Sequence, residues 1–268
     1  ISERETTKLP WKEHNIDVVV ESTGLFASYE KSQFHIEQGA KKVVISAPAK
    51  GDTGIVPGAT ILLSVNEEKF GTCDITSNGS CTTNAASPLI GILEEKLGIE
   101  KALLNTVHGY TSTQSLVDGP TRKSTFRDGR AAAQNIIPTS TGAAIAVTEA
   151  YPELVGLFDG IAMRVPVPAG SIVDVTFISK KETSVEEVNG FLKEAAESDQ
   201  WKQVFSATEE SLASTDILGT PFASIADLTM TRVVGGNLVK VLSWYDNEYG
   251  YTHTLVGHVI ATGKSIVR

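Results

Sequence analysis

Short apolar runs rich in β-branched residues recur through the first third of the chain, and each ends at glycine, proline or a polar cluster. Runs of this length and composition are typical of buried strands. They span residues 16–24, 41–48, 59–65 and 74–77. A helix is predicted over 28–38, and Gly39 marks its end. Since buried strands that alternate with helices form parallel sheets, this region is predicted to be an α/β domain.

A longer amphipathic segment follows at 82–98, where the apolar residues recur at helical spacing and predict one buried face. The run 101–107 predicts a strand that ends at His108. The chain from 109 to 135 is polar and is either a functional loop or disordered; we interpret it as a functional loop. Its basic residues are Arg122, Lys123, Arg127 and Arg130.

The second half of the chain predicts strands and helices that are segregated, which is typical of an α+β domain. The predicted helices span 141–150, 184–197 and 248–264, and the predicted strands span 161–165 and 171–179. Ser184 and Glu187 have the spacing of a capping box at the second of these helices. A hairpin is predicted over 233–241, with its turn at Gly235-Gly236-Asn237.

Composition excludes several classes of protein. The 268 residues are 41% hydrophobic and 21% charged, which is ordinary for a globular chain, and no apolar run is long enough to span a membrane. The polar start of the sequence does not resemble a signal peptide. A net charge of −9 argues against nonspecific nucleic-acid binding. Two cysteines, with no Cys/His cluster, predict neither a disulfide scaffold nor a metal site and favour a reducing, cytoplasmic location.

Cys81 stands where a predicted strand meets the start of a predicted helix. The free amides and the positive dipole end of a helix N-terminus favour thiolate over thiol and could also bind an oxyanion. An isolated cysteine is more often a buried structural residue, but the hydroxyl and amide side chains around Cys81 argue against an apolar setting. Cys73 lacks such neighbours, and we interpret it as structural.

Three further positions suggest chemistry, although each has an ordinary structural interpretation. His108, at a strand end, could be the general base for a thiol, or simply a structural histidine. Thr141-Gly142 begins a helix and suits either an anion or a plain N-cap. Arg164 is a charge within an apolar strand, and an arginine in that setting usually has a carboxylate or a bound phosphate as its partner.

Motifs spread over the whole chain resemble those of the phosphorylating glyceraldehyde-3-phosphate dehydrogenases, in the family's order and spacing. They are Ser80-Cys-Thr-Thr-Asn84, Thr106-Val-His108 with Tyr110-Thr111, Ala131–Pro138, Ser140–Ala144, Met163-Arg-Val-Pro166, and Ser243–Glu248 with Gly250-Tyr251. The resemblance implies an NAD-dependent enzyme that converts glyceraldehyde 3-phosphate and inorganic phosphate to 1,3-bisphosphoglycerate. It implies catalytic roles for Cys81, as the nucleophile that forms a thioester, and His108, as its base.

The same resemblance implies the binding residues, and it implies no metal. Thr111 and Arg164 match the site for the substrate phosphate, and Ser80, Thr82, Thr141 and Gly142 match the site for the attacking phosphate. The positions that match cofactor contacts are Arg4, Thr23, Gly24, Ser46, Asn247 and Tyr251. Members of the family are usually cytoplasmic homotetramers, with no nucleic-acid or membrane partner.

The glycine fingerprint that opens a dinucleotide-binding domain does not occur before Cys81. We therefore expect an N-terminally partial sequence that binds NAD weakly or not at all. The implied fold is the remnant of a Rossmann-type NAD-binding domain, lacking its first strands, over 1–80. An α+β catalytic domain with a mixed or antiparallel sheet follows over 81–246, and a C-terminal helix over 247–268 returns to the first domain.

Three alternatives stay open at this point. Erythrose-4-phosphate dehydrogenase is a close relative, although Thr111 and Thr141-Gly142 favour the triose enzyme. A partial chain could instead be a catalytically silent binding module. A non-redox acyl transferase or hydrolase could use the same Cys/His pair, but Asn247 argues against it because that residue matches a nicotinamide contact.

Overall fold

The computed structural model describes residues 2–49, 56–121 and 125–266, which form two compact units. One unit comprises Ile1–Ser80 with His253–Arg268, and the other comprises Cys81–Thr252. Arg122 and Lys123 of the basic cluster lie outside the described residues. Each unit is described by itself.

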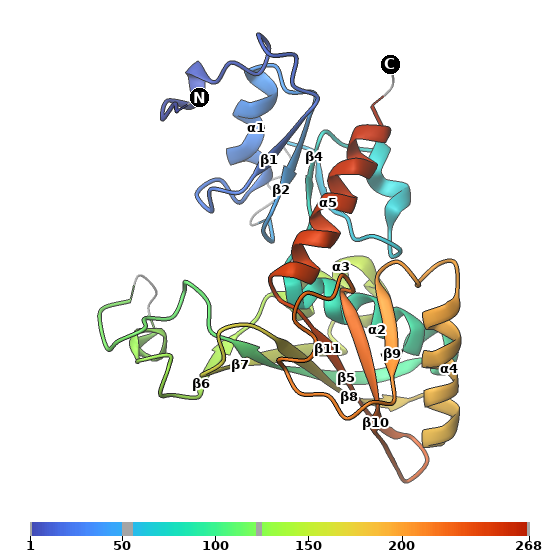
Figure 1. Ribbon diagram of the computed structural model, residues 1–268. Helices are drawn as coiled ribbons and strands as arrows, with labels where there is room; N and C mark the ends of the chain where they lie inside the picture. Colours follow the sequence, from blue (N-terminus) through green and yellow to red (C-terminus); the bar gives the residue numbers. More distant parts are fainter. Residues whose placement is uncertain (1, 50–55, 122–124, 267–268) are drawn as a thin grey trace. The chain divides into compact units, whose positions relative to one another are not determined.

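The first unit contains a four-stranded parallel sheet in the order β1-β2-β4-β3 (Figure 1). Its strands are β1 (Val18–Glu21), β2 (Lys42–Ile45), β3 (Gly58–Thr60) and β4 (Ile75–Ser77). The 3-10 helices Thr6–Lys8 and Glu67–Gly71 also belong to this unit. The four strands confirm the predicted parallel α/β arrangement, but the third is shorter than expected. Its apolar run leaves the sheet at Ile61 and enters a turn in which Ser64 has a positive φ of 66°.

Helix α1 (Tyr29–Glu37) begins as its sequence predicts, because the Ser28 hydroxyl accepts a hydrogen bond from the amide of Lys31. Tyr29 packs with Val43, Ile45 and Ile75 in the core of this unit. From the C-terminal helix α5 (Tyr249–Lys264), His258 hydrogen-bonds Thr76 at 2.7 Å and is completely buried. The predicted helix is confirmed, and His258 is one of its packing residues.

The second unit contains a seven-stranded mixed sheet in the order β6-β7-β5-β8-β11-β10-β9. Its strands are β5 (Ile99–Gly109), β6 (Ile137–Ser140), β7 (Phe158–Val165), β8 (Ser171–Ser179), β9 (Phe205–Thr208), β10 (Ser224–Val234) and β11 (Leu238–Tyr245). Its helices are α2 (Cys81–Leu97), α3 (Ala143–Ala150) and α4 (Val185–Glu197), with 3-10 turns at Phe126–Gly129 and Pro152–Leu154. The predicted hairpin forms between β10 and β11.

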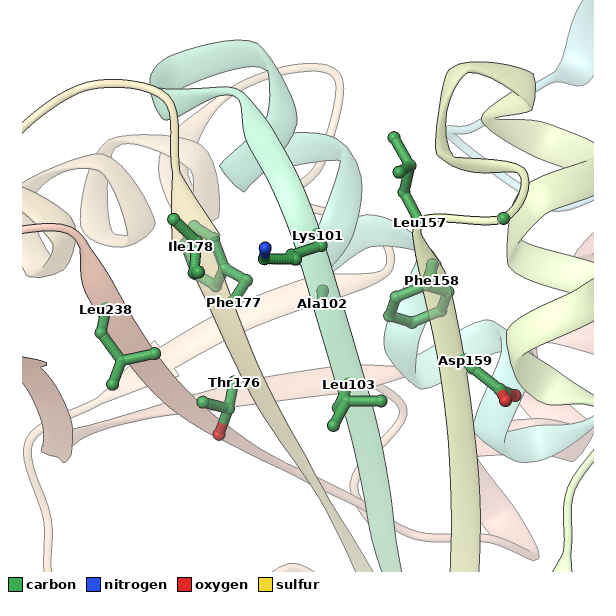
Figure 2. Close-up of a pocket in the computed structure, with 11 residues that line it drawn as sticks. Lys101, Ala102, Leu103, Leu157, Phe158, Asp159, Thr176, Phe177, Ile178 and Leu238 are labelled. Atoms are coloured by element: carbon green, nitrogen blue, oxygen red, sulfur yellow. The ribbon is translucent and has the colours of Figure 1, made fainter.

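Burial alternates strictly along β8, as a sheet with one covered face requires. Val173, Val175 and Phe177 are buried, and α2, α3 and α4 pack against the sheet. Leu103 is 66% exposed, and residues of β5, β7, β8 and β11 line a hollow of about 720 Å³ (Figure 2). This sheet face is therefore largely apolar and uncovered within the described chain.

One local expectation needs correction. The Ser184 hydroxyl caps α4 by accepting from the Glu187 amide, but the Glu187 carboxylate accepts from Thr183 and does not complete a capping box. In the described part of the stretch 109–135, the Gln114 side-chain amide donates to the Asp128 carboxylate at 3.0 Å, and the Ser115 backbone amide donates to the Asp128 carbonyl at 2.9 Å. None of the helices in the described ranges combines the length and apolar character needed to cross a membrane.

Candidate active site

Helix α2 begins at Cys81 itself, so the thiol stands at the end of the helix where backbone amides have no carbonyl partner within the helix. The side chain is half-buried. Strand β5 brings His108 to the same place, because its parallel pairing with β7 and antiparallel pairing with β8 fix its C-terminal end. The Cys81 Sγ lies 3.4 Å from the Nε2 of His108. The structure thus brings together the two residues that the sequence nominates for catalysis.

The other ring nitrogen of His108 determines what Nε2 can do. Nδ1 lies 2.6 Å from the carbonyl oxygen of Gly109, which can only accept a hydrogen bond. In the tautomer with the proton on Nδ1, the lone pair of Nε2 faces the sulfur, which suits a general base that takes the thiol proton. The guanidinium of Arg164, which can only donate and lies 2.5 Å from Nδ1, favours the opposite tautomer of the resting ring.

Arg164 faces His108 across the β5–β7 pairing, where the two residues are in register. Its Nη1 lies 2.5 Å from Nδ1 of His108 and 3.2 Å from the oxygen of Gly109. Its Nε is buried and has no hydrogen-bond partner among the described residues. A buried guanidinium in this position is suited to receive an anionic ligand.

Electrostatics keep the resting pair neutral. Burial, followed by the charge of Arg164, lowers the pKa of His108 to about 4. Burial raises the pKa of the Cys81 thiol, and the opposing effects of Arg164 and Thr82 are smaller. The expected lowering of the thiol pKa by the helix N-terminus is therefore wrong for this state, because desolvation outweighs it.

Tyr245 is a site residue to which the sequence assigned no role. Its hydroxyl lies 2.9 Å from the hydroxyl of Thr82 and 2.8 Å from that of Thr106. Its ring meets the His108 ring edge-on, with 5.8 Å between centroids. Tyr245 therefore ties the first turn of α2 to strand β5, next to the reacting pair. Only its place within the Ser243–Glu248 motif could have indicated this.

The residues that match phosphate contacts differ in how their polar groups are used. The Thr82 hydroxyl is buried and contacts the Tyr245 hydroxyl, and the Thr82 amide hydrogen-bonds the Cys81 sulfur. The Thr141 hydroxyl accepts from the amide of Ala143 at 3.1 Å, where α3 begins, and Gly142 is exposed beside it. The Thr111 amide donates to Gln114 at 3.0 Å. Ser80 directly precedes Cys81 and is half-buried.

The residues that match cofactor contacts belong to both units. In the first unit, Gly24 and Ser46 line a small hollow of about 70 Å³ at the carboxyl ends of β1 and β2, the edge where parallel sheets bind ligands. Thr23 adjoins it, whereas Arg4 lies exposed ahead of the 3-10 helix Thr6–Lys8.

In the second unit, the amide oxygen of Asn247 accepts from the Gly170 amide and the Ser171 hydroxyl, each at 3.0 Å. These bonds fix the side chain so that its NH₂ group is the edge left to meet a ligand carboxamide. This fits a nicotinamide. Tyr251 is half-buried in the first turn of α5. In the described ranges, no three His, Cys, Asp or Glu side chains are grouped as a metal site needs.

Comparisons with known proteins agree with this geometry. The family model described as "Glyceraldehyde 3-phosphate dehydrogenase, C-terminal domain" matches residues 80–247. The chain is 48% identical to the glyceraldehyde-3-phosphate dehydrogenase of Clostridium pasteurianum over 259 residues, which cover 95% of this chain and 75% of that protein. The enzymes of that name from Mycobacterium avium and Streptomyces coelicolor are 46% and 43% identical, covering 96% and 99% of this chain and 74% and 78% of theirs. The chain therefore belongs to the glyceraldehyde-3-phosphate dehydrogenase family of NAD-dependent oxidoreductases.

Proposed function

We propose that this chain oxidises glyceraldehyde 3-phosphate with NAD and inorganic phosphate to 1,3-bisphosphoglycerate, through a thioester on Cys81. The observation that supports this most is the 3.4 Å contact between Cys81 Sγ and His108 Nε2. A nucleophile and a base within reach of each other at a helix N-terminus are what acyl transfer through sulfur requires.

His108 takes the thiol proton on Nε2 while Cys81 forms a carbon–sulfur bond to the aldehyde carbon. The carbonyl oxygen becomes an oxyanion, which the Cys81 amide and the protonated His108 stabilise by hydrogen bonds. NAD, when bound, supplies the acceptor for the hydride of that carbon. A phosphate oxygen then attacks the thioester, the carbon–sulfur bond breaks, and the sulfur takes its proton back from His108.

Two anion sites flank this pair in the proposal. Arg164 and Thr111 hold the substrate phosphate, and the buried, unpaired Nε of Arg164 supports that role. The attacking phosphate is bound by Ser80, Thr82, Thr141 and Gly142, where α2 and α3 begin. The cofactor contacts Arg4, Thr23, Gly24, Ser46, Asn247 and Tyr251, and the fixed amide of Asn247 orients the nicotinamide.

We further propose a cytoplasmic homotetramer in which the NAD-binding domain spans 1–80 and the catalytic domain spans 81–246, with the last helix returning to the first domain. Exposed apolar side chains support the assembly: Phe126 is 90% exposed and Val117 is 76% exposed on the long loop, and the hollowed sheet face in Figure 2 is also apolar. Sedimentation at micromolar concentration tests it, and a monomer would contradict the proposal.

The activity is tested by measuring NADH formation from glyceraldehyde 3-phosphate and from erythrose 4-phosphate by the whole protein. Higher turnover of the triose is expected, and it should be lost in Cys81→Ala and retained in Cys73→Ala. Preference for the tetrose would favour the related enzyme. Iodoacetamide labelling that is no faster at Cys81 than at Cys73 would favour a silent binding module.

A further inference from the structure

A buried carboxylate lies at the end of strand β1, in the first unit. Glu21 is only 4% exposed, and both of its oxygens accept hydrogen bonds. Oε2 lies 3.0 Å from Nε2 of His35, a buried residue of α1. Oε1 accepts from the amide of Thr23 at 2.8 Å and from its hydroxyl at 2.5 Å. Although burial raises the pKa of Glu21, these hydrogen bonds more than offset it, and the net pKa is lowered.

Trp11 fixes the direction of the hydrogen bond between His35 and Glu21. The indole nitrogen of Trp11 lies 3.0 Å from Nδ1 of His35. An indole N–H can only donate, so Nδ1 must accept and the single proton of a neutral imidazole must lie on Nε2. That proton points at Glu21. Trp11, His35 and Glu21 thus form a one-way chain of donors that ends in a carboxylate.

The Glu21 carboxylate also holds the turn that follows β1. It engages both the amide and the hydroxyl proton of Thr23, so Thr23 Oγ1 can act only as an acceptor, as it does toward the amide of Leu25 at 3.2 Å. The same turn contains Gly24, which has a positive φ of 73°. Ser46 closes the other side through a 3.1 Å contact with Ser22.

We propose that Glu21, which accepts a hydrogen bond from His35, is a positioning residue that fixes the Ser22–Gly24 turn for the nicotinamide dinucleotide. The proposal rests on the proposed function, because Thr23 and Gly24 line the cofactor site only in that reading. It assigns Glu21 a role in cofactor affinity, with no contact to the reacting atoms.

Glu21→Gln tests the directionality. A glutamine offers one acceptor and one donor group, so either the His35 N–H or the Thr23 N–H must face another donor. In Glu21→Gln/Trp11→Phe, His35 is free to move its proton to Nδ1 and to accept from the glutamine NH₂, while the glutamine oxygen serves Thr23. The second change therefore restores every bond that the first breaks, although the carboxylate charge is absent from both variants.

The measurements are KM and kcat for NAD in the whole protein, with thermal midpoints to verify folding. Glu21→Gln is expected to raise KM for NAD at least about tenfold, the cost of one unsatisfied buried donor, with kcat within about twofold. Trp11→Phe alone stays near wild type, and the double variant recovers most of the affinity. A double variant as weak as Glu21→Gln, or a Glu21→Gln with unchanged KM, overturns the proposal.

Long-range ¹H–¹⁵N spectra of the histidine rings give a second readout that needs no variant. They are expected to show His35 protonated on Nε2 alone, and a proton on Nδ1 overturns the proposal even if Glu21→Gln fails to fold. A wild-type protein that neither binds NAD nor oxidises the triose phosphate would instead contradict the proposed function.

Discussion

The guanidinium of Arg164 contacts the ring of His108 at Nδ1, with 2.5 Å between Nη1 and Nδ1. A cation this close opposes protonation of the base. The same arginine has a buried Nε without a hydrogen-bond partner among the described residues. An anion bound there would accept from Nε and would also offset the positive charge that opposes protonation of His108. The arrangement links the protonation of His108 to the occupancy of the neighbouring anion site.

Removing that cation is therefore expected to make His108 more basic. In Arg164→Gln, the pKa of His108 should rise from about 4 but stay below its ordinary value, because burial is the larger cause of its depression. An NMR titration of the His108 ring protons measures it. Arg130→Gln, which removes only a surface partner of Asp118, serves as the control. An unchanged or lower pKa in Arg164→Gln would show that the arginine does not act on the ring.

Because His258 is buried, we expect the free energy of unfolding to fall in acid. Burial lowers its pKa to about 4, so below the unfolded value of 6.5 the unfolded chain binds a proton that the native chain does not. The contribution of His258 to the free energy of unfolding is fully present above pH 6.5. It falls by about 1.4 kcal/mol per pH unit as the pH drops toward 4. Urea unfolding at stepped pH should show this slope reduced in His258→Gln. The exposed His253→Gln should keep the wild-type slope, and equal slopes in all three proteins would refute the prediction.

Gly91 in helix α2 is expected to resist substitution for lack of space. A Cβ there would lie 2.2 Å from the Tyr151 hydroxyl, which donates to the Ser87 carbonyl, so Gly91→Ala should destabilise by about 1–3 kcal/mol. Gly190 in α4 has open space around its Cβ position, and Gly190→Ala should stabilise by about 0.5–1 kcal/mol. Denaturant midpoints measure both, and effects of the same sign would contradict the packing described here.

Tyr245→Phe removes the hydroxyl that joins Thr82 to Thr106. Two buried hydroxyls then lose a partner, and the free energy of unfolding should fall by about 1–3 kcal/mol. The rate of Cys81 alkylation should also change, since the first turn of α2 loses its tie to β5. Tyr249→Phe, at an exposed position, is the control. A Tyr245→Phe protein as stable as the control would mean that the hydroxyl bridge contributes nothing.

The long helices and the buried strands could be predicted from sequence because their periodicity reports burial directly. Strands β6 and β9 and the first part of β10 were missed, since their residues are too polar for the pattern. Tertiary partners supply what propensity does not: the hydroxyls of Ser224 and Ser243 lie 2.7 Å apart, and Asp227 accepts from the Trp244 indole at 3.0 Å. Such polar positions become strand only when the neighbouring strand is present.

For the candidate site, the sequence nominated Cys81, His108 and Arg164 because motif spacing and strand ends indicated them. It could not give the direction of the thiol pKa, which depends on burial by segments far along the chain. The Trp11–His35–Glu21 chain was also invisible, because its members lie 24 and 14 residues apart and each is ordinary alone.

The most direct test of the thioester on Cys81 is a single turnover of the whole protein with glyceraldehyde 3-phosphate and NAD in the absence of phosphate. The account predicts a burst of one NADH per active site, followed by a halt, with the acyl mass located on Cys81 by mass spectrometry. Continued NADH formation without phosphate, or an acyl group on any other residue, would contradict it.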